Sequence, residues 1–505
     1  MTRSLALPRS RQLLALALLA FAACSVLCLV WGWVGCIGSD DWIYIQNARE
    51  RIHDPWMIGV DHWSVRLTMT LPLAFALASL GESEFAAILP TLVYCLATGA
   101  LMLIFVWRRS GTWAAVLLGL FLAASPLLVI NATTMRVDTV ENFYVISALL
   151  CFLAALRREG AAHWLIAAGV LAGLAFVTRP TTVALLAYFG VLFLSGYGIR
   201  RSRYLLVLAG FAVVWIAESL YYLHGTGHWF HRLVVDFNHD QVTRGGTLFD
   251  AVVLAPLRMV LASHNLGLTF WLLPPLCWYA GRDRIAGEAV ARLVRLLTLF
   301  VAVWIAVFSV FASKLVLDPR YLTPALTAAL AVIALAVQVL WQHQHRALGG
   351  VIALAILATQ GLGLYVENKD FMYAEHWLVR LAKESPETIY TDPQTRERAL
   401  FLLQLAGVDK RTSSKLPPPG GLYLYVPVNA ASGTYAGTRW QPKDYEPLDW
   451  PVVDTNDPGQ TALGRALQAA GVSSRLPPVI WTKISYPNPA VHLLRRPAPA
   501  ANGPG

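Results

Sequence analysis

The sequence predicts a mostly α-helical protein that crosses a membrane many times and ends in a small α/β domain. Of its 505 residues, 56% are hydrophobic and only 14% are charged, whereas a soluble domain carries roughly 25% charged residues. Apolar segments long enough to cross a bilayer, about 20 residues each, recur up to residue 366. Beyond that point the apolar runs shorten, and Lys and Pro become frequent.

The apolar segments predict about eleven membrane spans. The first continues past Cys24 to Val34, which is too long for a signal-peptide core, so we expect it to be retained. Only Arg179 and Pro180 separate the segments 163–179 and 181–198. Two interpretations stay open for them: separate crossings or one tight hairpin. An amphipathic stretch at 248–264 is expected in the membrane interface or dipping into the bilayer. The predicted spans are 13–35, 84–107, 112–130, 139–157, 163–179, 181–198, 203–223, 266–281, 295–312, 322–341 and 347–366.

Arginine placement predicts the orientation of these spans. Arg residues concentrate in alternate connections, which the positive-inside rule places in the cytoplasm. We therefore expect a multi-pass plasma (inner) membrane protein with a cytoplasmic N-terminus and an exoplasmic or periplasmic C-terminal domain. The predicted parts are a membrane domain at 1–366, an outer α/β domain at 367–496 and a disordered tail at 497–505. The inner Arg residues are Arg3, Arg9, Arg11, Arg108, Arg109, Arg157, Arg158, Arg200, Arg201, Arg203, Arg282, Arg284, Arg292, Arg295 and Arg346.

Composition and residue spacing argue against nucleic-acid binding and against a disulfide or zinc framework. The net charge is +10, but its Arg residues are scattered as short clusters between apolar runs, so no continuous basic face for nucleic acid is predicted. The six Cys lie in or beside apolar segments without disulfide or zinc spacing. A loop at 224–247 gathers possible metal ligands, but their spacing matches no tight motif, so no metal site is assigned. These are His224, His228, His231, Asp236, His239 and Asp240.

The first outer loop, at 36–83, holds the main candidates for chemistry. Asp40 and Asp41 follow the first span almost directly, and ionisable groups at the edge of a membrane are functional candidates. Two amphipathic stretches, 42–52 and 62–72, predict helices lying in the membrane surface. The alternative for Asp40 is that it only caps the helix that follows it.

The second outer loop adds Arg136, Asp138 and Glu141 in a very short connection between two spans. These side chains are therefore expected close to the membrane plane. Asp138 is predicted either to pair with Arg136 or to cap the next span.

Four cations on the predicted outer face are candidates for holding a phosphate. Arg binds a phosphate through a bidentate fork, and Lys offers a compact charge. Partly buried Glu218 lies on the same face. The alternative for each cation is that it reaches toward lipid headgroups. The four are Arg66, Arg179, Lys314 and Arg320.

Together these motifs resemble the membrane glycosyltransferases of the C-type fold, which use polyprenyl-phosphate sugars. This superfamily includes the lipid A aminoarabinose transferase and the protein O-mannosyltransferases. The resemblance covers residues 10–366 and follows the order of the motifs. It rests on Asp40-Asp41 with Tyr44, on Arg136-x-Asp138, and on the run from Arg320 and Tyr321 to Pro324.

The resemblance implies an inverting transfer of a hexosyl or pentosyl group to an envelope glycan, lipid or protein, as in lipopolysaccharide modification. Asp40 would act as general base, with Asp41 as the close alternative, and Asp138 would orient a substrate. Membrane lipids and the polyprenyl-phosphate sugar are the implied partners; no other cofactor is assigned, and a divalent cation is left open. Substrate positioning is assigned to Tyr44, His62, Arg136, Glu141, Glu218 and Tyr321.

One departure from the resemblance leaves the sugar open. Some relatives carry a Lys/Arg-Pro-Pro segment in the first loop, where this chain has the run from Asp61 to Arg66. Two other functions stay open as well. A lipid-linked-substrate transporter or flippase would carry internal repeats and charges at mid-membrane, and a non-catalytic scaffold would tolerate loss of Asp40.

Overall fold

The computed structural model describes residues 6–157, 161–238, 249–311, 318–368, 370–427, 434–435, 438–439 and 450–498. The chain forms two compact units. The first unit comprises Met1–Gly35 and Ile43–Glu367, and the second comprises Cys36–Trp42 and Asn368–Gly505. The predicted fold class is confirmed: the described chain is mostly helical, with one small sheet region near its C-terminal end.

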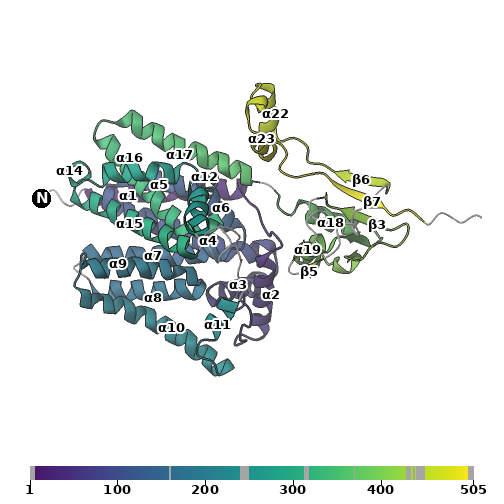
Figure 1. The fold of residues 1–505 in the computed structure, drawn as a ribbon, viewed down its shortest axis with the longest axis horizontal. Coiled ribbons are helices and arrows are strands. Elements are labelled where there is room, and N and C mark those ends of the chain that lie inside the picture. The colour runs from purple at the N-terminus through teal and green to yellow at the C-terminus, as the bar shows by residue number, and fades with distance from the viewer. Residues whose placement is uncertain are drawn as a thin grey trace, which may run out of the picture. The chain divides into compact units, whose positions relative to one another are not determined.

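Long helices make up nearly all of the first unit, and α7, α8 and α10 lie side by side in it (Figure 1). Short 3-10 turns (η1 Pro180–Thr182, η2 Arg201–Arg203, η4 Pro319–Leu322) and a π-helical turn (η3 Asp250–Leu254) join some of them. The α-helices are α1 Ala6–Trp31, α2 Asp40–His53, which begins in the second unit, α3 Leu67–Leu80, α4 Glu84–Ser110, α5 Thr112–Ala124, α6 Pro126–Thr133, α7 Val137–Arg157, α8 Ala162–Thr178, α9 Val183–Ser195, α10 Tyr204–Thr226, α11 His231–Asn238, α12 Ala255–Ala262, α13 Thr269–Ala280, α14 Asp283–Ala286, α15 Glu288–Phe311, α16 Thr323–Gln342 and α17 Arg346–Glu367.

Each predicted span overlaps one α-helix or, at 112–130, two α-helices. Not all of these helices are as long as a membrane span. In the described residues, seven helices are long and apolar enough to cross a membrane, judged by length and composition alone. An eighth is added if α5 and α6 are counted as one bent crossing. Helices α8, α9 and α13 are shorter, so the predicted number of eleven stays a prediction.

A proline accounts for one difference from the predicted spans. The segment 112–130 was expected to be one span, but α5 ends at Ala124 and α6 starts at Pro126 with a bend of 57°. Proline lacks the backbone N–H that would continue the helix and its ring clashes with the preceding turn. Helix α13 contains Pro274 and Pro275 and is only 12 residues long.

The surface helices of the first outer loop were predicted with partly different bounds. The first, expected over 42–52, is α2. The second was expected over 62–72, but residues 62–66 form turns, and α3 starts only at Leu67 and runs on to Leu80. Apolar residues continue past Pro72, so this helix is longer and more apolar than the sequence pattern suggested.

The core of the first unit centres on α16, most of whose side chains are fully buried. Its many alanines let neighbouring helices approach closely. Glycines do the same between α8 and α10: a Cβ at Gly169 would lie 2.1 Å from the Val207 carbonyl oxygen, and one at Gly210 would lie 2.3 Å from that of Ile166. This packing fixes the end of α8, where charged side chains gather.

The second unit contains a five-stranded sheet with the strand order β2-β1-β3-β7-β6. Strand β1 (Ile389–Thr391) pairs in parallel with β2 (Thr412–Ser413) and β3 (Leu422–Tyr425), whereas β7 (Val491–Arg495) pairs antiparallel with β3 and β6 (Val452–Asn456). Its apolar core includes side chains of two helices, α18 (Tyr373–Glu384) and α19 (Pro393–Leu405), and of strands β1, β3 and β7. The remaining elements are η5 Asp409–Arg411, β4 Thr434–Tyr435, β5 Thr438–Arg439, α22 Ala462–Ala469, η6 Ser473–Arg475 and α23 Pro478–Ser485.

Candidate active site

The acidic pair at the start of α2 splits into two different roles. The Asp41 carboxylate is buried and accepts the backbone N–H groups of Ile37 at 2.7 Å, Gly38 at 3.2 Å and Ser39 at 2.6 Å. A carboxylate in the first turn also interacts favourably with the helix dipole. Asp41, rather than Asp40, therefore has the structural role of ordering this turn.

Asp40 occupies the same helical turn but is partly exposed. Within the described part of the chain, no hydrogen bond or ion pair of its carboxylate is found. Of the two neighbouring acids, Asp40 is thus the one whose carboxylate is available to accept a proton from a substrate.

A first group of charged side chains surrounds Asp138, in the first turn of α7. This Asp138 cluster contains Asp138, Glu141, Arg179, Arg320 and Tyr321. Arg179 donates to Asp138 Oδ1 and lies 3.7 Å from Glu141 Oε2, and Arg320 Nε lies 4.0 Å from Asp138 Oδ2. Both carboxylates are only 1% exposed. Buried carboxylates need such partners, because an unpaired charge is costly away from water.

Local sequence explains how Arg179 reaches α7. The residue before a proline is driven into an extended conformation, and Arg179, with φ −160° before Pro180, ends α8 in this way. The following 3-10 turn presents Thr181 and Thr182, whose hydroxyls donate to Glu141 Oε1 at 2.7 and 3.1 Å. The Arg-Pro-Thr-Thr run thus brings one cation and two hydroxyl donors to the acids of α7.

Aromatic and acidic neighbours position the arginines further. The Arg179 guanidinium carbon lies 4.0 Å from the centroid of the Tyr321 ring, and that of Arg320 lies 5.6 Å from it, both within cation–π range. Asp318 accepts the backbone N–H of Arg320 at 2.9 Å and lies 3.5 Å from its Nε. Arg320 is nevertheless 23% exposed, so its guanidinium is accessible.

The charges in and around the Asp138 cluster are equal in number. Arg136 also acts electrostatically on Asp138, and Asp318 pairs with Arg320, so three guanidinium groups face three carboxylates. Among the described residues, Arg136 Nε, Arg320 Nε and Asp138 Oδ2 are buried without a hydrogen-bond partner. Buried polar atoms of this kind call for a bound water, ion or ligand. Three guanidinium groups, of which that of Arg320 is partly exposed, are available here to an anion.

A second group, the His62 cluster, contains Tyr44, His62, Arg66, Glu218, Arg232 and Asp236. Arg66 donates to the Tyr44 hydroxyl and to His62 Nε2, and His62 Nδ1 lies 3.0 Å from Asp236 Oδ1. Because arginine can only donate, Nε2 must accept, and the His62 proton lies on Nδ1, toward Asp236.

Arg232 closes the His62 cluster on the other side. Its guanidinium lies 3.5 Å from Asp236 Oδ2 and 3.5 Å from Glu218 Oε2, and it donates to the Phe176 carbonyl oxygen at 2.8 Å. Burial alone would raise the pKa of Asp236. The hydrogen bond from His62 and the charge of Arg232 outweigh this, so the pKa of Asp236 lies below its ordinary value.

The two clusters meet at the C-terminal end of α8. Phe176 contacts the His62 cluster, Arg179 belongs to the Asp138 cluster, and Thr178 Oγ1 between them hydrogen-bonds Thr68 Oγ1 of α3 at 2.7 Å. The structure thus brings nearly all the predicted first-unit site residues to one end of one helix. Asp40 and Asp41 belong to the second unit, and Lys314 lies outside the described residues.

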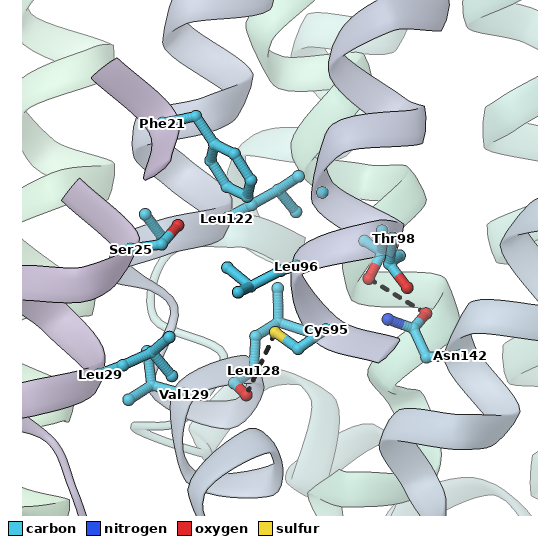
Figure 2. Close-up of a pocket in the computed structure, with 13 residues that line it drawn as sticks. Phe21, Ser25, Leu29, Cys95, Leu96, Thr98, Leu122, Leu128, Val129 and Asn142 are labelled. Carbon is cyan, nitrogen blue, oxygen red and sulfur yellow. Dashed lines mark hydrogen bonds between the residues drawn. The ribbon is translucent and has the colours of Figure 1, made fainter. Parts of the chain in front are cut away.

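Figure 2 shows a small apolar pocket beside α7. Phe21, Leu29 and Leu96 contribute to its walls, and Asn142 lies at its edge. Asn142 Oδ1 accepts from Thr327 of α16 at 3.2 Å. Asn142 follows Asp138 by four residues and so lies on the same face of α7, which places an apolar pocket one helical turn from the charged cluster.

Within the described residues, the predicted loop ligands do not gather into a metal site. Among the described residues, no group of three or more His, Cys, Asp or Glu side chains could hold a metal ion. Asp236 belongs to the His62 cluster, and His231 Nε2 lies 2.8 Å from the Gly59 carbonyl oxygen. His239 and Asp240 lie outside the described residues.

Sequence reasoning missed Arg232 and the threonines beside Pro180. Arg232 lies four residues before Asp236 on α11, the spacing at which helical side chains are neighbours. That spacing was visible in the sequence. The pairing of Arg232 with Glu218, by contrast, requires α10 and α11 to fold against each other.

Comparison with known proteins agrees with this architecture. The family model described as dolichyl-phosphate-mannose-protein mannosyltransferase matches residues 67–222, a stretch that includes Asp138, Arg179 and Glu218. No curated protein matches the chain.

Two solved structures are similar to the chain in fold. One is ArnT from Cupriavidus metallidurans in the apo state, at 14% identity over 85% of this chain and 95% of that chain, with a TM-score of 0.53. The other is the same protein bound to undecaprenyl phosphate, at 14% identity over 83% and 93%, again with a TM-score of 0.53. The resemblance to glycosyltransferases of the C-type fold is thus confirmed at the level of the fold.

Proposed function

We propose that this chain is an integral membrane glycosyltransferase that transfers a sugar from a polyprenyl-phosphate donor to an acceptor at the outer face of the membrane. The observation that carries the proposal is the gathering of three guanidinium groups around Asp138, of which that of Arg320 is partly exposed, next to an apolar pocket. A donor with a phosphate and a long hydrocarbon chain has matching chemistry. The fold likeness and the matched family model support it.

In the proposed reaction, an acceptor hydroxyl or amine attacks the anomeric carbon of the donor. Asp40 takes the proton from the acceptor, a new bond forms to the anomeric carbon, and its bond to the phosphate oxygen breaks on the opposite face. The sugar configuration is therefore inverted, and polyprenyl phosphate leaves. A positioned general base contributes about 10²–10⁴-fold to such a step.

The leaving phosphate gains negative charge as its bond to the sugar breaks, and preorganised cations stabilise that charge. We assign this role to Arg320, whose side chain is partly exposed, and to Arg136, with Arg179 in support. Asp138 holds Arg179 and Arg320 in place, and Glu141 and Tyr321 position the same groups. Lys314 stays a predicted contributor.

Arg66 has a different assignment. It is only 3% exposed, and its guanidinium donates to Tyr44 and His62. We therefore propose that Arg66, with Tyr44, His62 and Glu218, shapes the site from the His62 cluster and positions the substrate indirectly. The N-terminus in the cytoplasm, the inner membrane location, the envelope acceptor and the hexosyl or pentosyl nature of the sugar belong to the same proposal.

The test uses lipids from cells that lack this protein, because these retain the unused donor. Purified full-length protein is added to an extract of their membranes, and released polyprenyl phosphate is measured by mass spectrometry. The wild type is expected to release it, and Asp40→Asn to be at least about 10²-fold slower with an unchanged thermal midpoint.

Asp41→Asn serves as the matched control, because it weakens three hydrogen bonds within the turn. It is expected to lower thermal stability as well as turnover. Full turnover in Asp40→Asn would contradict the assignment of the base, and a wild type that releases no polyprenyl phosphate would contradict the proposed function.

A further inference from the structure

The segment that carries the acidic pair packs as part of the second unit. Residues Cys36–Trp42 belong to the same compact unit as Asn368–Gly505, although more than 300 residues of chain separate them. Several contacts to this segment come from one helix, α19. Its side chains therefore bear directly on where Asp40 is held.

Two residues of α19, three positions apart and so on one helical face, contact the segment. Arg398 Nε donates to the Ile37 carbonyl oxygen at 3.3 Å, and the ring centroids of Phe401 and Trp42 lie 6.3 Å apart. The two contacts hold the segment on both sides of Asp40.

Gly38 makes the fit between the segment and α19 close. Its φ of +61° favours glycine, and a Cβ there would lie 2.6 Å from the Cα and the carbonyl oxygen of Arg398. Backbone atoms of a helix cannot easily give way, so only glycine lets the segment approach α19 at this point.

Arg398 is itself held in place. Its Nη2 donates to the Phe371 carbonyl oxygen at 2.8 Å, and its Nε lies 3.3 Å from Glu375 Oε1 on α18. Glu375 is 2% exposed, and burial, which outweighs the charge of Arg398, raises its pKa to about 7. Burying this pair is costly, and two fixed anchors leave the guanidinium little freedom to move away from Ile37.

We propose that α19 is a positioning element for the candidate base Asp40, acting through Arg398, so that the second unit is part of the catalytic machinery. This rests on the proposed function, in which Asp40 takes a proton from the acceptor. Arg398 orders the turn from Ile37 to Ser39, Asp41 locks that turn internally, and Asp40 is left at a fixed place with a free carboxylate. A misplacement of about 1 Å can reduce turnover about 10²-fold.

The experiment combines Arg398→Ala in the full-length protein with two readouts. Hydrogen exchange at residues 37–39 reports whether the turn is still ordered, because those N–H groups are bonded to Asp41. Turnover on the extracted donor lipids gives kcat and KM. Exchange is expected to accelerate, and kcat to fall about 10–100-fold with KM for the donor within about twofold.

Matched variants in the same unit control for general damage. Arg495 forms an exposed ion pair with Glu387 at 3.6 Å, so Arg495→Ala is expected to leave both readouts unchanged. Gly38→Ala is expected to reproduce the effects of Arg398→Ala, although it leaves the charge of Arg398 in place. Gly420 also has a positive φ, but a Cβ there would have open space around it. Gly420→Ala is therefore the control for Gly38→Ala.

The outcomes separate this inference from the proposed function. Unchanged exchange in Arg398→Ala, or faster exchange with unchanged kcat, would overturn the positioning role while leaving the transferase intact. A larger KM with unchanged kcat would overturn it too. A wild type without turnover would remove the proposed function, and with it the positioning of a base, even if exchange showed that α19 holds the segment.

Discussion

The Asp138 cluster and the His62 cluster lie at the same end of α8 and use the same residue types, yet their arginines differ in exposure. Around Asp138, the Arg320 side chain is 23% exposed, although it lies close to Asp138 and Asp318. Around His62, Arg66 and Arg232 are each 3% exposed, and both donate hydrogen bonds to neighbouring groups. An accessible guanidinium suits a ligand, whereas a buried and hydrogen-bonded one suits a scaffold.

The comparison teaches that an arginine on the outer face is not by itself evidence for phosphate binding. Arg66 and Arg320 looked equivalent in the sequence. In the structure Arg66 is 3% exposed and donates to two side chains of its own cluster, whereas the Arg320 side chain is 23% exposed. The surroundings of each guanidinium, rather than its presence, separate the two roles.

The largest expected effect is on stability, in the His62 cluster. Arg232→Ala leaves Glu218 and Asp236 without their shared cation, and removal of one partner of a buried ion pair costs about 3–5 kcal/mol. The thermal midpoint of the purified protein should fall strongly. Arg49→Ala, which removes an exposed pair with Glu82, is the control and should cost under about 1 kcal/mol. Equal midpoints for the two variants would contradict a scaffold role.

The next effect is on turnover, in the Asp138 cluster. Arg320→Ala should slow release of polyprenyl phosphate about 10²–10³-fold, the usual cost of losing one preorganised donor to developing charge. Its thermal midpoint should change little. Arg295→Ala, another arginine in an exposed pair, should keep full turnover. If Arg320→Ala lost stability but not turnover, the two clusters would not differ as proposed.

The smallest effect concerns pH. The pKa of Asp236 is lowered in the folded protein, so its contribution to stability is fully present above its unfolded pKa, about 3.9, and is lost as the pH falls through its lower folded value. The midpoint of the wild type should therefore drop more steeply than that of Asp236→Asn below about pH 4. Parallel curves for the two proteins down to acid unfolding would show that Asp236 is not held as a charged partner.

Sequence reasoning reached the helical membrane fold because hydropathy and proline are local signals. The break at Pro126 and the short α13 with Pro274 and Pro275 were also visible locally, but the apolar runs around them masked the change in direction. The sequence suggested Arg179 only as a phosphate ligand on the outer face. Its pairing with Asp138 and Glu141 was not predicted, because it depends on the packing of α7 against α8.

Other features depended on contacts between distant parts of the chain. Asp40 and Asp41 are chemically identical neighbours, and only the fold of the turn shows which carboxylate its N–H groups occupy. The sequence offered no catalytic role for the C-terminal region, because Arg398 meets Ile37 across about 360 residues of chain. Whether the carboxylates and cations act on one substrate, as predicted, is what the turnover measurements decide.

The charges at the start of α7 also constrain how the protein is made. Asp138 and Glu141 leave the ribosome before Arg179. Without a partner, each carboxylate would cost several kcal/mol if it faced lipid. Arg179 follows at the far end of the next helix, so α7 and α8 are favoured to enter the bilayer as a pair. Arg320 lies much further along the chain, so it can join these acids only after most of the membrane domain has been synthesised.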